Sequence, residues 1–148
     1  NALRRSRDLL ASVLDGSADP IFAKDAEGRF VLLNRPAAAL LGVSVEAALG
    51  WRASELLPPA AAAALEKADR EVMASGETRA LEDEVATPGS ERRVLLTTKA
   101  AWRDAEGRTV GVIGVSRDIT ERSRAEALVE ARRREMESLQ AELLHVSR

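Results

Sequence analysis

The sequence predicts an α+β fold: a five-stranded antiparallel sheet with short helices on one face, flanked by N-terminal and C-terminal amphipathic helices. Along the chain, two short apolar strands come first, several short helical segments follow, and three strands come last, with hairpin-sized links between neighbouring strands. This order is typical of an antiparallel sheet that carries its helices on one face. Residues 121–148 contain no Gly or Pro, which favours one long helix.

The composition excludes several classes of protein. The chain has 148 residues, 45% of them hydrophobic, and a formal net charge of −2, which is unlike a disordered chain or a nucleic-acid-binding protein. It contains no cysteine, so disulfides, thiolate metal sites and cysteine nucleophiles are excluded. No stretch approaches the ~20 apolar residues that cross a bilayer, and the first residues lack the apolar core of a signal peptide. We therefore expect a cytoplasmic location, no membrane segment and no nucleic-acid partner.

The first segment, residues 1–17, predicts a short amphipathic helix. Leu3, Leu10 and Val13 fall at the a and d spacing of a heptad, with Ser6 completing the pattern. The Asp-Gly-Ser sequence at 15–17 marks the predicted end of this helix. We expect this helix to enter the globular part from outside.

A hairpin is predicted next. Residues 20–24 and 29–33 are short apolar strands separated by Asp-Ala-Glu-Gly at 25–28. The sequence Asp-Ala-Glu-Gly-Arg recurs at 104–108, again between two apolar strands. Since the flanking residues differ, we interpret the recurrence as one kind of turn used twice, with glycine supplying a positive φ, and not as a duplicated domain.

Short helices are predicted between the two sets of strands. Asn34 can cap a helix that ends at Gly42, and Ser44 can cap a second helix that ends at Gly50. Two prolines then open a longer helix, which Gly76 closes. The predicted buried face of this longer helix is made of Ala61, Leu65, Ala68 and Val72.

Three strands complete the predicted sheet, with a loop of residues 88–92 between the first two. They cover residues 78–87, 94–102 and 109–117. Alternation along the middle strand predicts an inward face, made of Val94, Leu96, Thr98 and Ala100, with Trp102 in the core. Lys99 falls on the opposite face and is expected in solvent. The acidic run 82–84 is expected to form a solvated edge.

The last strand continues without a linker into the C-terminal helix, and this junction is the most informative part of the sequence. Asp118 followed three residues later by Glu121 has the form of a capping box, in which each side chain accepts a backbone N–H of the first helical turn. We predict that Asp118, Thr120 and Glu121 form the joint through which movement of the sheet reaches the helix.

The C-terminal helix carries the a/d seam of a coiled coil, because its seam positions alternate spacings of four and three over three heptads. From Ala125 onward, the seam consists of Val129, Arg132, Met136, Leu139, Leu143 and Val146. A helix alone would leave this seam in water, so we expect it to pair with a second copy. Arg132 is the weak point of the seam, since a charge there costs stability and can fix the register or permit two packings.

Two motifs resemble the PAS sensor domains of bacterial signalling proteins. The sequence at 34–42 resembles the family's Asn-x-x-Ala-x-x-x-x-Gly helix, and Asp-Ile-Thr-Glu-Arg at 118–122 matches its exit signature. The resemblance runs from about residue 18 to 124 and implies a PAS fold with a signalling helix on each side. The chain then divides into an N-terminal helix at 1–17, a PAS domain at 18–120 and a C-terminal coiled-coil signalling helix at 121–148.

Residues 142–148 resemble the segment that precedes the phosphoacceptor helix in sensor histidine kinases, especially those similar to haem-PAS oxygen sensors. The resemblance implies that the chain is part of a longer protein and leads to a kinase core after Arg148. His145 is not expected to be the phosphorylated residue, because the family's His-Glu-x-x-x-x-Pro box is absent. A solvated helical histidine is the simpler interpretation.

PAS domains bind haem, flavin, small acids or nothing, so the residues have to distinguish these cases. Residues 60–75 contain no histidine to ligate haem, and Met73 is expected to pack. A covalent flavin would need a cysteine, and no metal site is predicted. An unknown small ligand would be held near Leu40, Val43 and Trp51, although core packing is the favoured role of Trp51.

The sequence contains no glycine-rich phosphate loop, no metalloprotease motif and no Ser/His/Asp set, so no enzymatic activity is predicted for this part of the chain. The leading hypothesis is a regulatory PAS module of a two-component sensor histidine kinase, a homodimer that transmits conformational change through the Asp-Ile-Thr junction into a coiled coil. The alternatives are a PAS sensor of a small molecule or a non-covalent flavin, and a PAS module of a cyclic-nucleotide signalling enzyme.

Overall fold

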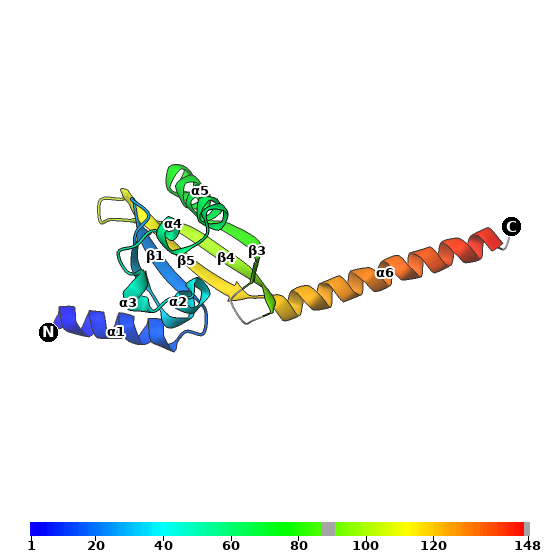
Figure 1. Ribbon diagram of the computed structural model, residues 1–148, viewed down its shortest axis with the longest axis horizontal. Helices are drawn as coiled ribbons and strands as arrows, with labels where there is room; N and C mark the ends of the chain where they lie inside the picture. The colour runs from blue at the N-terminus through cyan, green and yellow to red at the C-terminus, as the bar shows by residue number, and fades with distance from the viewer. Residues whose placement is uncertain (87–90, 147–148) are drawn as a thin grey trace. The chain divides into compact units, whose positions relative to one another are not determined.

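The computed structural model describes residues 1–86 and 91–146, and the chain divides into two compact units, Asn1–Asp118 and Ile119–Arg148 (Figure 1). The first unit contains helices α1 to α5 and a five-stranded sheet. The second unit contains the long helix α6, Thr120–Val146. The α+β class expected from the order of strands and helices is confirmed.

All neighbouring strands of the sheet are antiparallel, in the order β2-β1-β5-β4-β3. The strands are β1 Ile21–Asp25, β2 Phe30–Leu33, β3 Arg79–Ala86, β4 Arg92–Arg103 and β5 Thr109–Asp118. The first and last strands of the sequence are therefore direct neighbours in the sheet. The predicted five-stranded antiparallel sheet is confirmed. The predicted loop over 88–92 falls mainly on residues 87–90, outside the described part of the chain.

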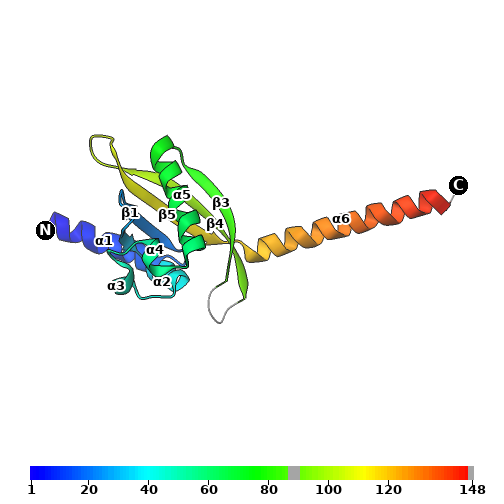
Figure 2. The same cartoon turned by 45° about the horizontal axis from the view of Figure 1, so that its top comes forward.

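Four helices of the described chain lie on one face of the sheet (Figures 1 and 2). They are α2 Arg35–Leu41, α3 Val45–Ala48, α4 Ala53–Leu56 and α5 Pro59–Ser75. α5 packs against β4 and β5, whereas α2 packs against β1. The sequence predicted α2, α3 and α5. It missed α4, a four-residue helix whose N-cap is Arg52, because arginine is not a helix-start signal.

Helix ends follow the predicted capping chemistry. The Asn34 side chain accepts a hydrogen bond from the Ala37 N–H at the start of α2, and the Ser44 side chain caps α3 in the same way. Gly42 and Gly76 end α2 and α5 with φ values of 74° and 69°, in the left-handed region that glycine tolerates best. The caps predicted at Asn34, Ser44, Gly42 and Gly76 are confirmed, whereas α3 ends before the predicted Gly50, with Leu49 as its C-cap.

The buried face of α5 differs in part from the prediction. Ala62, Asp69 and Val72 are its buried residues. Of the predicted set, Val72 is buried, while Ala61 is exposed. The periodicity alone placed the stripe about one residue away, because it could not anticipate that a charged residue, Asp69, belongs inside.

The first hairpin turn is organised by an aspartate. The Asp25 carboxylate accepts hydrogen bonds from the backbone N–H groups of Glu27 and Arg29, each at 3.0 Å. The Asp25 carbonyl accepts the N–H of Gly28, whose φ is 85°. An aspartate that bonds the backbone two residues on is a common turn device.

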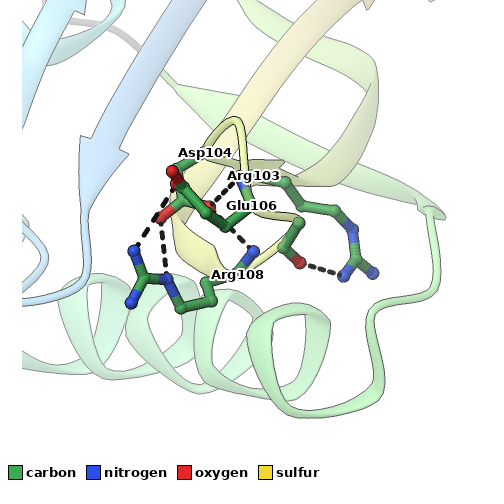
Figure 3. A network of polar contacts seen from close by, with 5 residues as sticks. Arg103, Asp104, Glu106 and Arg108 are labelled. Carbon is green, nitrogen blue, oxygen red and sulfur yellow. Dashed lines mark hydrogen bonds and ion pairs between the residues drawn. The ribbon is translucent and has the colours of Figure 1, made fainter.

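The second hairpin turn, between β4 and β5, repeats this arrangement (Figure 3). The Asp104 carboxylate accepts the N–H groups of Glu106 and Arg108 at 3.0 and 2.9 Å, and Gly107 has a φ of 80°. The Arg108 side chain also turns back to Asp104, with Nε 3.1 Å from Oδ2. The prediction that one kind of turn is used twice is confirmed.

The core between the sheet and the short helices is built from a few large and many small side chains. Phe30 and Leu33 of β2 pack against alanines of α2 and α3, which are Ala37, Ala38 and Ala48. Phe22 of β1 packs edge-on against Phe30, with 6.2 Å between ring centroids. Because alanine is small, the helices approach the sheet closely and leave little room between the layers.

Two glycines of β5 leave room for groups of the neighbouring strands. A Cβ at Gly114 would meet the ring of Phe22 on the neighbouring strand. A Cβ at Gly111 would meet the carbonyl oxygen of Lys24, and would lie 2.8 Å from the indole of Trp102. The glycine spacing of this strand is therefore a packing requirement, because any side chain would force its neighbours apart.

The inward face of β4 is the opposite of the predicted one. Leu95 and Lys99 are buried, with exposures of 6% and 1%, whereas Thr98 is exposed. By alternation, the set predicted to face inward lies on the outer face, namely Val94, Leu96, Thr98, Ala100 and Trp102. The expectation that Lys99 lies in solvent was wrong, because the lysine is buried together with an ion-pair partner.

β3 forms an edge of the sheet, and its acidic run lies in solvent. Glu82, Asp83 and Glu84 are all exposed. The solvated edge expected for these residues is confirmed. Charged side chains on an edge strand discourage pairing with other chains.

The N-terminal helix α1, Ala2–Gly16, has no buried residue. Its apolar side chains, including Leu3, Leu10 and Val13, are exposed. The helix ends before Ser17, whose N–H donates to the Leu14 carbonyl. The predicted helix and its stop are confirmed, and its apolar stripe has no cover within the described chain.

α6, taken by itself, is a 27-residue helix with an exposed seam. Its predicted seam residues are all exposed, namely Val129, Arg132, Met136, Leu139, Leu143 and Val146. Among the described residues, no helix is long and apolar enough to cross a membrane.

Candidate functional site

The chain enters the sheet beside the point where it leaves. β1 pairs with β5 so that Ile21 lies opposite Val115. One residue earlier, the Pro20 carbonyl accepts the Ser116 N–H at 2.9 Å. The segment that follows α1 is thus hydrogen-bonded to the last residues of β5, only a few residues before Asp118.

Asn34 ties the end of α1 to the same region. Its Nδ2 donates to the carbonyls of Leu14 and Asp19 at 3.1 and 2.9 Å, and its Oδ1 accepts the Ile21 N–H at 3.0 Å. The side chain is 2% exposed, so its bonds are shielded from water. One asparagine therefore holds the last turn of α1, the connecting segment and the start of both β1 and α2.

The sequence predicted only the capping role of Asn34. Its link to Leu14 was missed, because a hydrogen bond across 20 residues leaves no mark in a local pattern. The only available signal was that Asn34 begins the motif that resembles the PAS helix.

Two ion pairs flank the end of β5. Arg117 Nε lies 3.7 Å from Asp19 Oδ2, and Arg93 Nε of β4 lies 3.0 Å from Asp118 Oδ2. All four side chains are at least one-third exposed, so each pair adds little to stability. Their contribution is geometric, because they orient the exit segment against the entry segment and against β4.

The three residues of the predicted joint occupy the transition from sheet to helix. Asp118 is the last residue of β5, and Thr120 is the first residue of α6 and is 2% exposed. Glu121 lies exposed in the first turn of the helix. The capping box between Asp118 and Glu121 stays a prediction.

A buried cluster of three charged residues joins three elements of the first unit. Lys24 Nζ of β1 lies 2.8 Å from Asp69 Oδ2 of α5, and Lys99 Nζ of β4 lies 2.7 Å from Asp69 Oδ1. Each carboxylate oxygen therefore serves one ammonium group. We call Lys24, Asp69 and Lys99 the buried triad.

Aromatic rings complete the surroundings of the buried triad. Lys24 Nζ lies 4.9 Å from the centroid of the Phe30 ring and 5.7 Å from that of Phe22. Burial lowers the pKa of Lys24, and the nearby Asp69 carboxylate opposes this effect. The ring faces favour the charged form of the ammonium group.

The triad was missed at the sequence level. A lysine within an apolar strand and an aspartate on an alanine-rich helix each suggest an exposed side chain, since such residues are seldom buried unless paired. A signal was present, because the chain has three lysines and two of them, Lys24 and Lys99, lie within apolar strands.

One of the three predicted ligand residues lines a pocket. Val43 lines a pocket of ≈350 Å³ with residues of α2 and α3, but Leu40 and Trp51 are not among its lining residues. Trp51 is 47% exposed, so the expected core packing was wrong. The Trp51 backbone is bonded to β2, since its carbonyl accepts the Phe30 N–H at 3.0 Å, whereas the indole side chain is exposed to solvent.

A second pocket, of ≈260 Å³, opens beside the buried triad. It is lined by the hairpin turn after β1, by α4 with its preceding residue and by α5, including Arg52, Ser54, Glu66, Asp69, Arg70 and Met73. Within the described residues, no group of three or more His, Cys, Asp or Glu side chains is arranged to hold a metal ion.

A known family shares three features with this chain. The helices separate the first two strands of the sheet from the last three in sequence, the short helices lie on one face, and a helix follows the last strand. The family described as PAS fold matches residues 14–124. The chain belongs to the PAS family. PAS domains are sensory, non-catalytic modules, and this one is related to the PAS domains of sensor histidine kinases.

Three PAS relatives illustrate the relationship. The chain is 29% identical over 119 residues to the methanogenesis regulatory histidine kinase FilI of Methanothrix harundinacea, covering 80% of this chain and 13% of FilI. The PAS domain of Bordetella pertussis BvgS superposes with a TM-score of 0.63 at 26% identity, covering 88% of this chain and 97% of that one. VqmA bound to DPO gives 0.68 at 25% identity, with coverages of 76% and 57%. The chain spans less than a fifth of the curated relatives it matches first.

Proposed function

We propose that this chain is a regulatory PAS module of a two-component sensor histidine kinase, a homodimer that relays conformational change from its N-terminal helix to its C-terminal helix. The pairing of β1 with β5 carries the proposal, because it lays the segment after α1 beside the segment that leads to Asp118. Movement at one end of the chain then has a short, hydrogen-bonded route to the other.

The route has three steps in this proposal. A displacement of α1 changes the bond between the Leu14 carbonyl and Asn34, which also holds the Ile21 N–H at the start of β1. β1 then shifts β5 through their shared ladder. The shift reaches α6 through the joint of Asp118, Thr120 and Glu121. The two states differ in whether the last turn of α1 is held, which supplies the differential contact that such a switch requires.

The homodimer in this proposal is formed through the flanking helices. The seam of α6 supports it, because exposed apolar residues repeat there at coiled-coil spacing. A helix of this length extends roughly 40 Å, enough for several heptads of pairing. Arg132 on the seam costs stability and either fixes the register or permits two packings, and the relay uses the second of these.

A kinase core later in the same protein, and a cytoplasmic location, complete the proposal. The histidine kinase FilI supports the first point, since it is similar to this chain over a small part of its own length. The division into an N-terminal helix, a PAS domain and a C-terminal coiled coil is then a division into input, relay and output.

The relay is tested by replacing Asn34, at the α1 end of the route, and measuring how the α6 helices pair. The chain has no cysteine, so a Gln140→Cys variant accepts one spin label per copy on α6. Electron-spin distance measurement then gives the distribution of label separations in the dimer. We expect Asn34→Ala to change this distribution, because it releases the last turn of α1.

The matched control is Ser44→Ala. It also removes an N-cap hydrogen bond, at α3, but Ser44 caps only its own helix. We expect the control to leave the distance distribution unchanged. Identical distributions in the Asn34 variant and the wild type would overturn the relay, and a monomer by sedimentation equilibrium would overturn the dimer.

Ligand sensing is a second candidate function, favoured by the similarity to VqmA, which was solved bound to DPO. In this reading a small molecule lies near Leu40, Val43 and Trp51, where Val43 lines a pocket. Native mass spectrometry of the purified chain tests it, because retained ligand adds mass to the protein. A spectrum with the polypeptide mass alone, together with a colourless preparation, would count against it.

A further inference from the structure

The buried triad holds more positive charge than negative. Two ammonium groups, those of Lys24 and Lys99, share the single carboxylate of Asp69, and all three side chains are at most 6% exposed. With both ammonium groups charged, the triad carries a net charge of +1 out of contact with water. Burial of an uncompensated charge is strongly unfavourable, and a buried lysine relieves it by giving up a proton.

The surroundings of Lys24 come from four elements of the first unit. On α5, Asp69 accepts a hydrogen bond from it and Glu66 lies near enough to act on its charge, whereas Lys99 of β4 repels that charge. β2 and β5, which also pack against it, contribute an aromatic ring and a valine. Burial lowers the pKa of Lys24, Asp69 opposes this effect, and Lys99 adds to it. Lys24 is therefore the member of the triad that releases a proton.

The choice of lysine supports a change of protonation state. Arginine supplies most of the positive charge of this chain, with only three lysines among its 22 basic residues. Two of the three lysines lie in the buried triad. Lysine shifts its pKa readily when buried, whereas arginine stays charged. A purely structural ion pair needs no such property, but a group that gains and loses a proton does.

A route for the proton leads through Asp69. The pocket of ≈260 Å³ beside α5 has Asp69 in its wall, and the Asp69 carboxylate is bonded to Lys24 Nζ at 2.8 Å. Water in the pocket reaches the carboxylate, so a proton can pass from the Lys24 ammonium group to solvent without unfolding of the domain. The nitrogen keeps its electron pair and becomes a neutral amine.

Loss of this proton changes what holds α5. When both lysines are charged, Asp69 accepts one charge-assisted hydrogen bond from β1 and one from β4. Hydrogen bonds in which the donor is charged are roughly twice as strong as neutral ones. A neutral Lys24 therefore weakens the tie to β1, while Asp69 and Lys99 remain a balanced ion pair.

We propose that the buried triad is a proton-operated latch: with Lys24 protonated, Asp69 ties α5 to both β1 and β4, and release of that proton as the pH rises leaves α5 tied to β4 alone. The protonated state carries the excess charge, so it becomes the less favourable state as the pH rises. The proton is then an input of this module.

The latch is placed to act on the proposed relay, and its output rests on that proposal. Lys24 lies on β1 opposite Val112 of β5, and Lys99 lies on β4 opposite Gly114 on the other side of β5. A change in which of these two strands α5 holds therefore bears on both neighbours of the exit strand.

Nuclear magnetic resonance of the lysine side chains tests the protonation step without reference to α6. The ¹⁵Nζ shift reports whether an amine is protonated, and the chain has only three lysines, so Lys24→Met and Lys67→Met assign all the signals. We expect the Lys24 signal to titrate with a midpoint below 10.5, the usual value for lysine. A Lys24 signal that stays fully protonated up to pH 10.5 would overturn the latch.

The spin label at Gln140→Cys tests the output. We expect the distribution of label separations to shift as the pH rises through the midpoint of Lys24. Lys24→Met should fold, because Asp69 and Lys99 remain paired, and should give the high-pH distribution at every pH, since its side chain carries no charge. Lys67→Met, at an exposed position of α5, is the control and should follow the wild type.

The two proposals fail in different ways. If Asn34→Ala alters the distances but pH does not, the latch is overturned and the relay stands. A pH-dependent shift that survives in Lys24→Met also overturns the latch, because another group then causes it. If neither Asn34→Ala nor pH alters the distances, the relay is overturned, and with it the effect of the latch on α6.

Discussion

The buried triad is the feature of the first unit that depends most on individual residues. Lysine and aspartate are seldom fully buried, and each pays a large desolvation cost when it is. Here Asp69 bridges two strands that are not neighbours, since β5 lies between β1 and β4. One carboxylate on α5 therefore fixes the helix against two strands of the sheet, β1 and β4.

Replacing Asp69 by asparagine is expected to destabilise the domain strongly. The variant leaves two buried ammonium groups without an anion, and breaking a buried pair in this way costs roughly 3–5 kcal/mol. Urea denaturation measures this loss in the free energy of unfolding. Lys67→Met, the exposed control, should stay within about 0.5 kcal/mol of the wild type. A loss no larger than that of the control would show that the triad is not ionised as described.

The stability of the domain is expected to rise with pH on the alkaline side. Burial lowers the pKa of Lys24 below its usual 10.5, so between the lowered value and 10.5 the unfolded chain binds more protons than the folded one. Stability therefore increases with pH across this window and levels off above it. The chain contains no Cys or Tyr to titrate in the same range.

This pH dependence can be followed in urea midpoints measured from neutral pH to about pH 11. The comparison variant is Lys24→Met, which should lose the rise. A wild-type midpoint that falls steadily over this range, in parallel with the variant, would contradict the assignment to Lys24.

At the scale of elements, the short helices α2 and α3 are positioned by hydrogen bonds at their N-termini. α2 begins at Asn34, which also reaches the end of α1, and α3 begins at Ser44. Small alanines then let these helices lie close to β2. In elements of four to seven residues, end contacts and packing decide the position, because such helices are not stable by themselves.

The start of α6 is expected to weaken when Asp118 is replaced by alanine. If Asp118 caps the helix, its loss costs about 1 kcal/mol, seen as a lower melting temperature and reduced helical signal in circular dichroism. The control is Arg93→Ala, which removes the half-exposed ion pair to Asp118 and should cost much less. Equal effects of the two substitutions would mean that Asp118 acts through Arg93 and not as a cap.

At the scale of the whole chain, both flanking helices present apolar stripes that the described chain does not cover. Leu3 and Val13 of α1 and Leu143 of α6 are each more than half exposed. The sheet and its helices form their own core, so these stripes are available for association. Exposed apolar patches of this kind are typical of protein–protein contact sites.

Replacing Arg132 by leucine is expected to strengthen the proposed homodimer. The substitution turns a charged seam position into an apolar one, and burying a leucine contributes roughly 1.5–3 kcal/mol, so association should tighten by about tenfold or more. Sedimentation equilibrium measures the change. Arg134→Leu, off the seam, is the matched control and should have little effect. A tightening as large with the control would show that the paired surface is not the predicted seam.

Much of the fold could be predicted because its signals are local. The capping residues Asn34 and Ser44, the stop at Gly76 and the repeated aspartate turns each act within a few residues, and each was found where expected. The candidate site was predicted less well. The face of β4 was inverted because the pattern treats a lysine as exposed, and Trp51 was expected in the core because the pattern treats indole as buried.

The sequence by itself determined the order of the strands and of every helix but α4, most of their ends and, through the resemblance, the PAS fold, because propensity, capping and strand alternation depend on neighbours in the chain. Only the tertiary structure decided which charges are buried together and how the entry segment meets the exit. Lys24, Asp69 and Lys99 are separated by 45 and 30 residues along the chain, and Asn34 reaches back 20 residues to Leu14. Whether a polar side chain is exposed or paired depends on partners that only folding brings within hydrogen-bonding distance.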